Sequence, residues 1–167
     1  VHGVNWAEAC LQGYPDERVR NERLAARVAR WLEGDVDVVC LQEVSGDQLA
    51  ALRRVARSSV FVHTAGRVPR FRIEGQAPLG DASENLVTLV ARASATRTDG
   101  RVFDNDPGKG VLAVDVTPGC LVLNTHVTHG TPGLVQLSLL KAMASAAPAV
   151  VLGDFNAPLD VVAPALG

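Results

Sequence analysis

Two kinds of hydrophobic pattern alternate along this chain and predict its secondary structure. Apolar residues spaced three or four positions apart predict helices over residues 16–33, 45–55 and 134–144. Short apolar runs rich in β-branched residues predict strands over residues 36–43, 60–63, 86–91, 111–116, 120–127 and 149–152. Because helices separate some strands and turns join others, this order favours a mixed α/β fold with helices outside the sheets.

Local signals refine several of these elements. The first helix is expected to bury one apolar stripe, made of Leu24, Val28, Trp31 and Leu32. Ser45 and Gln48 have the spacing of a helix capping box. The strand at 149–152 consists of four apolar residues and is expected to be fully buried. The pattern predicts a loop over residues 65–83 and a polar turn region over residues 96–110. It predicts no firm element over residues 157–167.

Composition bounds the class of protein. The 167 residues suit one domain, and 47% hydrophobic residues suffice for a substantial core. No apolar run approaches the roughly 20 residues that span a bilayer. A net charge of −2 gives no global basic field, so nucleic acid is a possible partner that the charge does not indicate. The three cysteines lack metal-type spacing, and the sequence shows no signal peptide, so the cellular compartment stays open.

An arginine-rich stretch offers one candidate site for phosphate. Six arginines and no acidic residue occur between Arg53 and Arg72. A solvated helix face followed by a polar loop explains most such runs. The alternative is a local grip for phosphate groups, in which Arg70 and Arg72 are the candidate contacts.

Three predicted strands end in polar residues that a bare core would avoid. They are Glu43, Asn124 with His126, and Asp154 with Asn156. In an extended chain Asp154 and Asn156 point to one side, whereas an Asx-rich turn leaving the strand is the simpler alternative. A structural, hydrogen-bonded role is likewise the simpler alternative for His126.

Brought together, these groups would form an oxygen-rich site. Carboxylates and amides suit Mg²⁺ or Mn²⁺, and the absence of a cysteine–histidine cluster in the sequence disfavours zinc. Such a site fits metal-assisted hydrolysis of a phosphate ester. The sequence contains neither a Gly-x-Ser-x-Gly motif nor a Walker-type glycine loop, because residues 106–110 lack the required spacing.

Three blocks, in this order, resemble the endonuclease/exonuclease/phosphatase superfamily, which includes pancreatic-type DNase, abasic-site endonucleases, sphingomyelinases and inositol-phosphate 5-phosphatases. The blocks are Leu41-Gln42-Glu43, Asn124-Thr125-His126 and Gly153-Asp154-Phe155-Asn156. The resemblance implies two packed mixed β-sheets flanked by helices, in a four-layer sandwich. It also implies a divalent-metal-dependent phosphoesterase that acts on a phosphodiester.

The resemblance further implies a role for each matching residue. Glu43 would ligate Mg²⁺ or Mn²⁺, and Asp154 would orient or deprotonate the attacking water. Asn156 would hold the phosphate or that aspartate, and His126 would donate to the phosphoryl oxygens or the leaving group. Asn124 would fix the strand end, with a contact to the substrate phosphate as its alternative.

Two departures from the family pattern affect these expectations. The family has a metal-site asparagine on its first strand, which here either precedes Val1 or is Asn5. Its terminal Ser-Asp-His block has no match after Asn156. Residues 1–167 are therefore expected to form a single family domain that is incomplete at both ends. The alternative function is a non-catalytic or repurposed member that binds a ligand or catalyses a different reaction.

Overall fold

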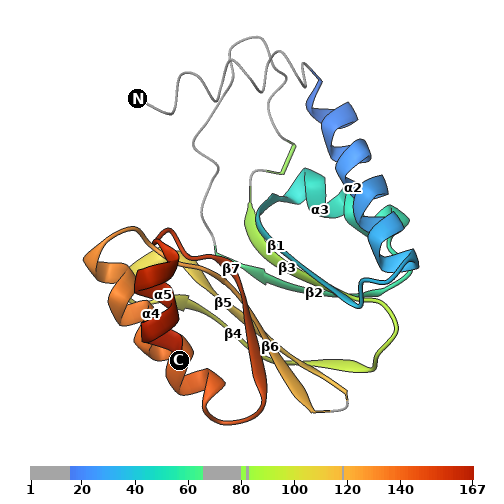
Figure 1. Ribbon diagram of the computed structural model, residues 1–167. Coiled ribbons are helices and arrows are strands. Elements are labelled where there is room, and N and C mark those ends of the chain that lie inside the picture. Colours follow the sequence, from blue (N-terminus) through green and yellow to red (C-terminus); the bar gives the residue numbers. More distant parts are fainter. Residues whose placement is uncertain (1–15, 66–79, 82, 118) are drawn as a thin grey trace.

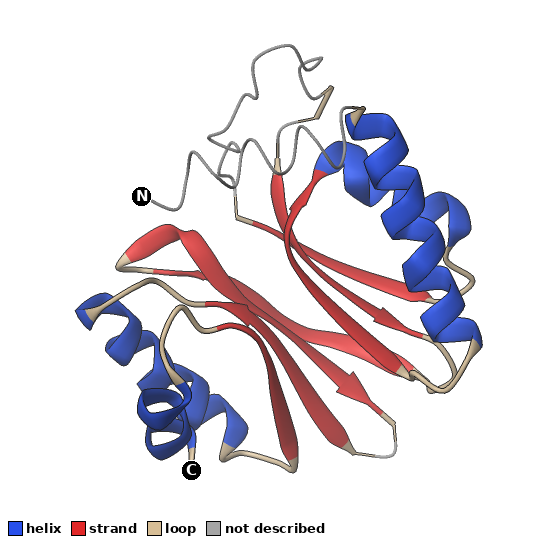
Figure 2. Cartoon of the chain, turned by 45° about the horizontal axis from the view of Figure 1, so that its top comes forward, coloured by secondary structure: helices blue, strands red, loops and turns tan. Residues whose placement is uncertain are grey.

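A computed structural model describes residues 16–65, 80, 81, 83–117 and 119–167. These residues form two β-sheets packed face to face, each with a pair of helices on its outer side (Figure 1). The helices lie on the two opposite flanks of the molecule (Figure 2). None of the described helices is long and apolar enough to cross a membrane. The predicted α/β class with outer helices is confirmed.

The first sheet has three described strands in the order β1-β3-β2, and both pairs are antiparallel. The strands are β1 (Val38–Ser45), β2 (Ser59–Thr64) and β3 (Glu84–Val90). Its outer face carries α2 (Glu17–Glu33) and α3 (Gly46–Val55). Mixed pairing was expected in both sheets, but the described strands of this sheet run antiparallel throughout.

The second sheet has four described strands in the order β4-β5-β6-β7. They are β4 (Ala95–Phe103), β5 (Asp106–Val116), β6 (Cys120–His126) and β7 (Ala149–Asp154). β5 and β6 form an antiparallel hairpin, and β6 pairs with β7 in parallel, so this sheet is mixed. The crossover between β6 and β7 is α4 (Thr131–Ala144), which packs on the outer face with α5 (Leu159–Leu166).

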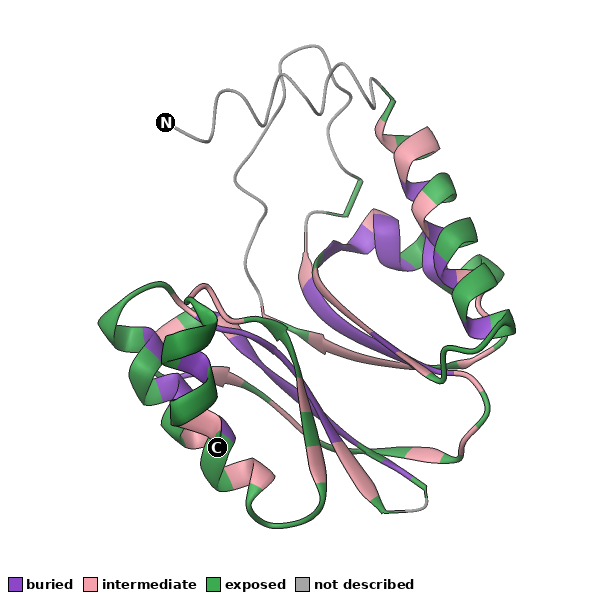
Figure 3. Ribbon diagram, viewed as in Figure 1, coloured by how far each residue is buried: buried purple, intermediate pink, exposed green. Residues whose placement is uncertain are grey.

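Side-chain alternation in β5 explains why the molecule has four layers. Val111 and Ala113 face α4 and α5, whereas Leu112 and Val114 face the other sheet. All four side chains are buried, so this strand supplies two separate apolar layers. Most of the β5 ribbon is accordingly coloured as buried in Figure 3. A third apolar cluster lies between β1, β3 and the helices α2 and α3. Three interfaces therefore join helix, sheet, sheet and helix.

Side chains cap both helices of the first sheet, as expected for Ser45, and one detail of the buried stripe differs from the expectation. The side chain of Asp16 accepts hydrogen bonds from the first turn of α2, and that of Ser45 accepts from Gln48 N at 3.2 Å. Val28 and Leu32 are buried as expected, but Trp31 is 44% exposed. Ala25 takes its place in the stripe, because this smaller side chain lies on the face that meets the sheet.

Three expectations were wrong. Residues 96–110 are mostly strand, because β4, the outermost described strand of its sheet, exposes polar side chains while its backbone pairs with β5. Residues 157–167 contain α5, although Pro164 lies inside it, because packing of its apolar face outweighs the lost hydrogen bond. The strand β7 is not fully buried: Val150 and Leu152 are 45% and 38% exposed, because only the alternate side chains pack against the helical layer.

Candidate active site

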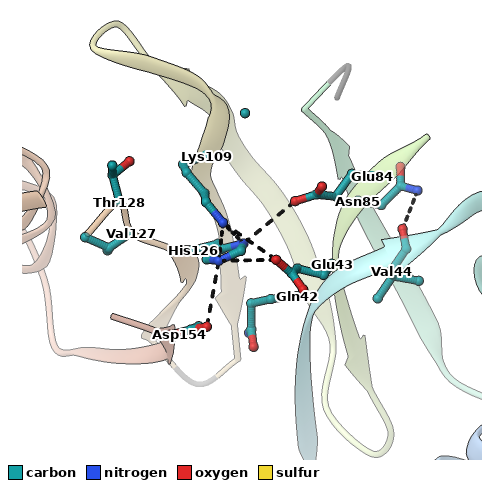
Figure 4. A network of polar contacts seen from close by, with 12 residues as sticks. Gln42, Glu43, Val44, Glu84, Asn85, Lys109, His126, Val127, Thr128 and Asp154 are labelled. Atoms are coloured by element: carbon teal, nitrogen blue, oxygen red, sulfur yellow. Dashed lines mark hydrogen bonds and ion pairs between the residues drawn. The ribbon is translucent and has the colours of Figure 1, made fainter. Parts of the chain in front are cut away.

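The candidate site lies where strands of both sheets end beside one another. The parallel register of β6 and β7 places His126 opposite Asp154, and the antiparallel register of β5 and β6 places Gly110 opposite His126. Glu43 reaches the same point from β1, across the interface between the sheets (Figure 4). The structure therefore brings together three of the strand-end residues that the sequence singled out.

A bulge in β1 directs Glu43 toward the site. The pairing of β1 with β3 shifts between Leu41 and Val44, and Glu43 has a φ of 54°. A positive φ is unusual for a residue other than glycine and re-aims the side chain relative to a regular strand. The Glu43 side chain is 66% exposed, and its Oε1 lies 3.8 Å from His126 Nε2. Glu43 therefore offers a solvent-accessible carboxylate beside a buried imidazole.

His126 is the centre of the site. Its side chain is only 3% exposed and lies among three carboxylates. Nε2 is 3.7 Å from Asp154 Oδ2, and Nδ1 is 3.8 Å from Glu84 Oε1. Lys109 Nζ also contacts both ring nitrogens, with a distance of 3.0 Å to Nδ1 (Figure 4). The imidazole is thus held by charged groups from four different strands.

The chain turns after Asp154 instead of staying extended. Asn156 has a φ of 48°, and its backbone N–H donates to Asp154 Oδ1 at 3.0 Å, which is the Asx turn that the sequence left as an alternative. The Asn156 side chain donates to Val127 O at 2.7 Å. A Cβ at Gly153 would lie 1.9 Å from Thr125 O, so only glycine fits there. The Asp154 carboxylate is therefore fixed by the turn against the end of β6.

Asn124 ties the two sheets together beneath the site. It is fully buried, and its Nδ2 lies 3.2 Å from Leu41 O and 3.0 Å from Val87 O. Its Oδ1 accepts a hydrogen bond from Gln42 Nε2 at 2.7 Å. These contacts occupy the amide with partners from the opposite sheet. They favour the strand-fixing role of Asn124 over contact with a phosphate group.

Two residues of the site escaped sequence reasoning. Glu84 is the first residue of β3, pairs in register with Ser45, and its side chain is 13% exposed. Lys109 lies between Gly108 and Gly110, in a stretch that the sequence only excluded as a phosphate-binding glycine loop. The sequence signal that could have found them is a charged residue just before an apolar run: Glu84 precedes residues 86–91, and Lys109 precedes residues 111–116.

The donor set fits a divalent ion. One ligand atom from each of Glu43, Glu84 and His126 lies within 4.8 Å of the other two. Two carboxylates suit Mg²⁺ or Mn²⁺, and imidazole is a common ligand of transition metals. Asn5, the other expected ligand, and Arg70 and Arg72, the expected phosphate contacts, lie outside the described residues.

Comparison with known proteins adds one sequence match and several structural matches. A family model described as "Endonuclease/Exonuclease/phosphatase family" matches residues 10–163. No curated protein sequence matches the chain. A truncated TDP2 from Caenorhabditis elegans superposes with a TM-score of 0.61 at 17% identity, covering 87% of this chain and 58% of that one. The chain therefore spans less than two thirds of the length of that relative.

Two further solved structures share the fold. The human Nocturnin catalytic domain with a bound sulfate anion gives a TM-score of 0.55 at 15% identity, over 86% of this chain and 60% of that one. A functionally unknown conserved protein from Enterococcus faecalis V583 gives 0.59 at 18% identity, over 87% of this chain and 62% of that one. At these identities the likeness concerns the fold alone.

Proposed function

The chain belongs to the endonuclease/exonuclease/phosphatase family, and on that premise we propose that it hydrolyses a phosphodiester with the help of a bound divalent metal ion. Members of this family are in general metal-dependent phosphoesterases, and membership suggests that activity here. One observation carries the proposal for this chain. The buried His126 lies within 3.8 Å of Glu43, Glu84 and Asp154 at an edge open to solvent.

Glu43 and Glu84 are the residues that would hold Mg²⁺ or Mn²⁺ in the proposed site. The exposed Glu43 carboxylate is accessible to an ion that keeps several water ligands, as these ions prefer. When bound, such an ion supplies charge neutralisation for the phosphoryl oxygens. The Glu84 carboxylate, at 3.8 Å from Nδ1, is also suited to orient the His126 ring.

Asp154 is proposed to orient and deprotonate the attacking water. Its side chain is 53% exposed, so water reaches it, and the hydrogen bond from Asn156 N keeps Oδ1 in place. Oδ2 then faces His126 Nε2 at 3.7 Å. Asn156 is therefore proposed to hold the aspartate. His126 is proposed to donate a proton to the leaving oxygen or a hydrogen bond to the phosphoryl oxygens.

The test is hydrolysis of bis(p-nitrophenyl) phosphate by the purified chain, with Mg²⁺ or Mn²⁺ and with chelator. Asp154→Asn keeps the shape of the side chain and should lower kcat by about 100-fold or more, because a positioned general base contributes at least that factor. Asp115→Asn is the matched control, since Asp115 is an exposed carboxylate near the opposite end of β5. That variant should retain wild-type turnover.

Metal binding is measured separately, by calorimetric titration of Mn²⁺ into wild type and Glu43→Gln. The variant should bind Mn²⁺ more weakly, because it loses the charge of one ligand. An unaltered titration would remove Glu43 from the metal site. Unchanged turnover in Asp154→Asn would refute the role of Asp154. A folded wild-type chain without metal-dependent turnover would favour the non-catalytic or repurposed alternative.

A further inference from the structure

A bulge in β5 places Lys109 in the site. The pairing of β4 with β5 passes from Val102 opposite Gly110 directly to Phe103 opposite Asp106. Residues 107–109 are therefore extra on β5, and such insertions re-aim side chains. A Cβ on Gly110 would lie 2.4 Å from Arg101 O, so the strands approach closely beside the bulge. The Lys109 side chain extends from this point toward His126 (Figure 4).

The Lys109 side chain is charged and largely withdrawn from water. It is only 11% exposed, and its Nζ lies 3.7 Å from Glu43 Oε1 and 3.0 Å from His126 Nδ1. An ammonium in such a position loses hydration that nearby groups must replace. The described contacts of Nζ are the two ring nitrogens of His126 and Glu43 Oε1, and the ammonium carries three N–H donors that a bound oxygen can share. Lys109, Glu43, Glu84 and His126 also line one small cleft, so a group bound there is within reach of Nζ.

The carboxylates around this cleft give it an excess of negative charge. Glu43, Glu84 and Asp154 contribute three carboxylates near His126. A phosphodiester adds another negative charge, and more charge develops on its non-bridging oxygens during attack. A divalent ion alone does not balance the three carboxylates. Lys109 adds a positive charge to the lining of this cleft, where its Nζ contacts Glu43 Oε1 and the His126 ring.

We propose that Lys109 is a phosphate-binding residue whose Nζ donates to a non-bridging oxygen of the phosphodiester. This inference rests on the proposed function for its substrate class. The ammonium stabilises the charge that the oxygen gains during attack, as preorganised donors do at other developing oxyanions. Glu43 has two carboxylate oxygens, so the approach of Oε1 to Lys109 leaves Oε2 available for a divalent ion.

The chain offers a direct binding test, because Lys109 and Lys141 are its only lysines. A wild-type sample labelled with ¹³C at lysine Cε should give two signals, which the spectra of Lys109→Arg and Lys141→Arg assign. Titration with dimethyl phosphate in the presence of Mg²⁺ should shift the Lys109 signal in a saturable way. The Lys141 signal is the internal control, since this exposed side chain on α4 donates to Gly167 O and lies outside the described site.

Kinetic measurements test whether Lys109 acts on the non-bridging oxygen or on the proton donor of the leaving group. Lys109→Met should lower kcat by about 100-fold, as loss of one oxyanion donor does elsewhere, whereas Lys141→Met should not change it. The loss should be equal for phosphodiesters with p-nitrophenyl and with alkyl leaving groups, because the non-bridging oxygen is the same in both. If Lys109 only positioned His126 as the proton donor, the alkyl diester would suffer selectively.

The binding and kinetic results separate this inference from the proposed function. A saturable Lys109 shift in a chain without turnover would support the phosphate contact and refute the activity. A Lys109 signal that dimethyl phosphate leaves unmoved, but that Mn²⁺ broadens, would overturn the inference and identify Lys109 as a counter-ion of Glu43. Because the titration uses wild-type protein, these outcomes do not depend on whether Lys109→Met folds.

Discussion

Replacing Asn124 by alanine should destabilise the protein more than any ordinary surface substitution. The side chain is fully buried between the sheets and satisfies partners on the opposite sheet. Its Nδ2 has two hydrogens, so two strong donated bonds and the one accepted from Gln42 are lost. Each buried partner left unsatisfied costs about 1–3 kcal/mol. With three such partners the expected loss is at least about 3 kcal/mol, a large share of the roughly 5–15 kcal/mol of a typical domain.

The measurement is urea unfolding followed by circular dichroism at 25 °C, with the midpoint and the m-value fitted separately. A fall in midpoint at constant m reports stability alone. Ser138→Ala is the control, because Ser138 Oγ also donates to a backbone carbonyl, Leu134 O at 3.1 Å, but is exposed. Water can replace its lost bond, so its cost should be about 0.5 kcal/mol or less.

A second comparison separates packing from hydrogen bonding. Asn124→Asp keeps the shape but turns a donor toward Leu41 O and Val87 O into an acceptor, so it should be at least as destabilising as alanine at pH 7. In a double-mutant cycle, Gln42→Ala should add less in the Asn124→Ala background than in wild type. A loss below 1 kcal/mol in Asn124→Ala would refute the view that this amide fastens the two sheets.

Two further predictions concern buried titratable groups. Burial, followed by the charge of Arg97, lowers the pKa of His63, although Asp99 and the backbone of Arg101 oppose this. A lowered pKa favours the neutral form in the fold, so the free energy of unfolding should fall as pH drops below about 6.5, and urea titrations of His63→Gln should lack that component. Burial raises the pKa of Cys40 to about 11, against a smaller opposing hydrogen bond from Thr88. At pH 8, iodoacetamide should therefore modify Cys40 about 100-fold more slowly in the folded chain than in the chain unfolded by urea, and equal rates measured by peptide mass spectrometry would contradict this.

The elements that the sequence predicted are those in which local chemistry and packing agree. Ser45 caps α3 as its spacing from Gln48 indicates, and the β5–β6 hairpin follows from two apolar runs around a short turn. The sequence failed where position in the fold overrides residue type. The polar β4 is a strand because it pairs at an edge, and α5 forms around Pro164 because α4 supplies an apolar surface.

The two site residues that were missed depend on register, which a single sequence does not reveal. Lys109 reaches the site because three residues of β5 have no partner on β4. Glu84 reaches it because β3 pairs with the end of β1, opposite Ser45. In both cases the residue type is unremarkable in sequence, and only strand pairing shows which charges meet.

Each of the three sequence blocks supplies one residue to the site and another that holds that residue in place. Gln42 precedes Glu43 and binds Asn124, which lies two residues before His126 on the same face of β6. Asn156 likewise follows Asp154 and fixes it to the end of β6 through Val127.

Because a site residue and the residue that holds it lie close together in each block, a short block predicts part of the site. The hydrogen bond between Gln42 and Asn124 sets the spacing of the two sheets next to the contact between Glu43 and His126. A substitution at Gln42 should therefore lower turnover through geometry, with an unchanged pH profile, whereas a substitution at His126 should change the profile itself.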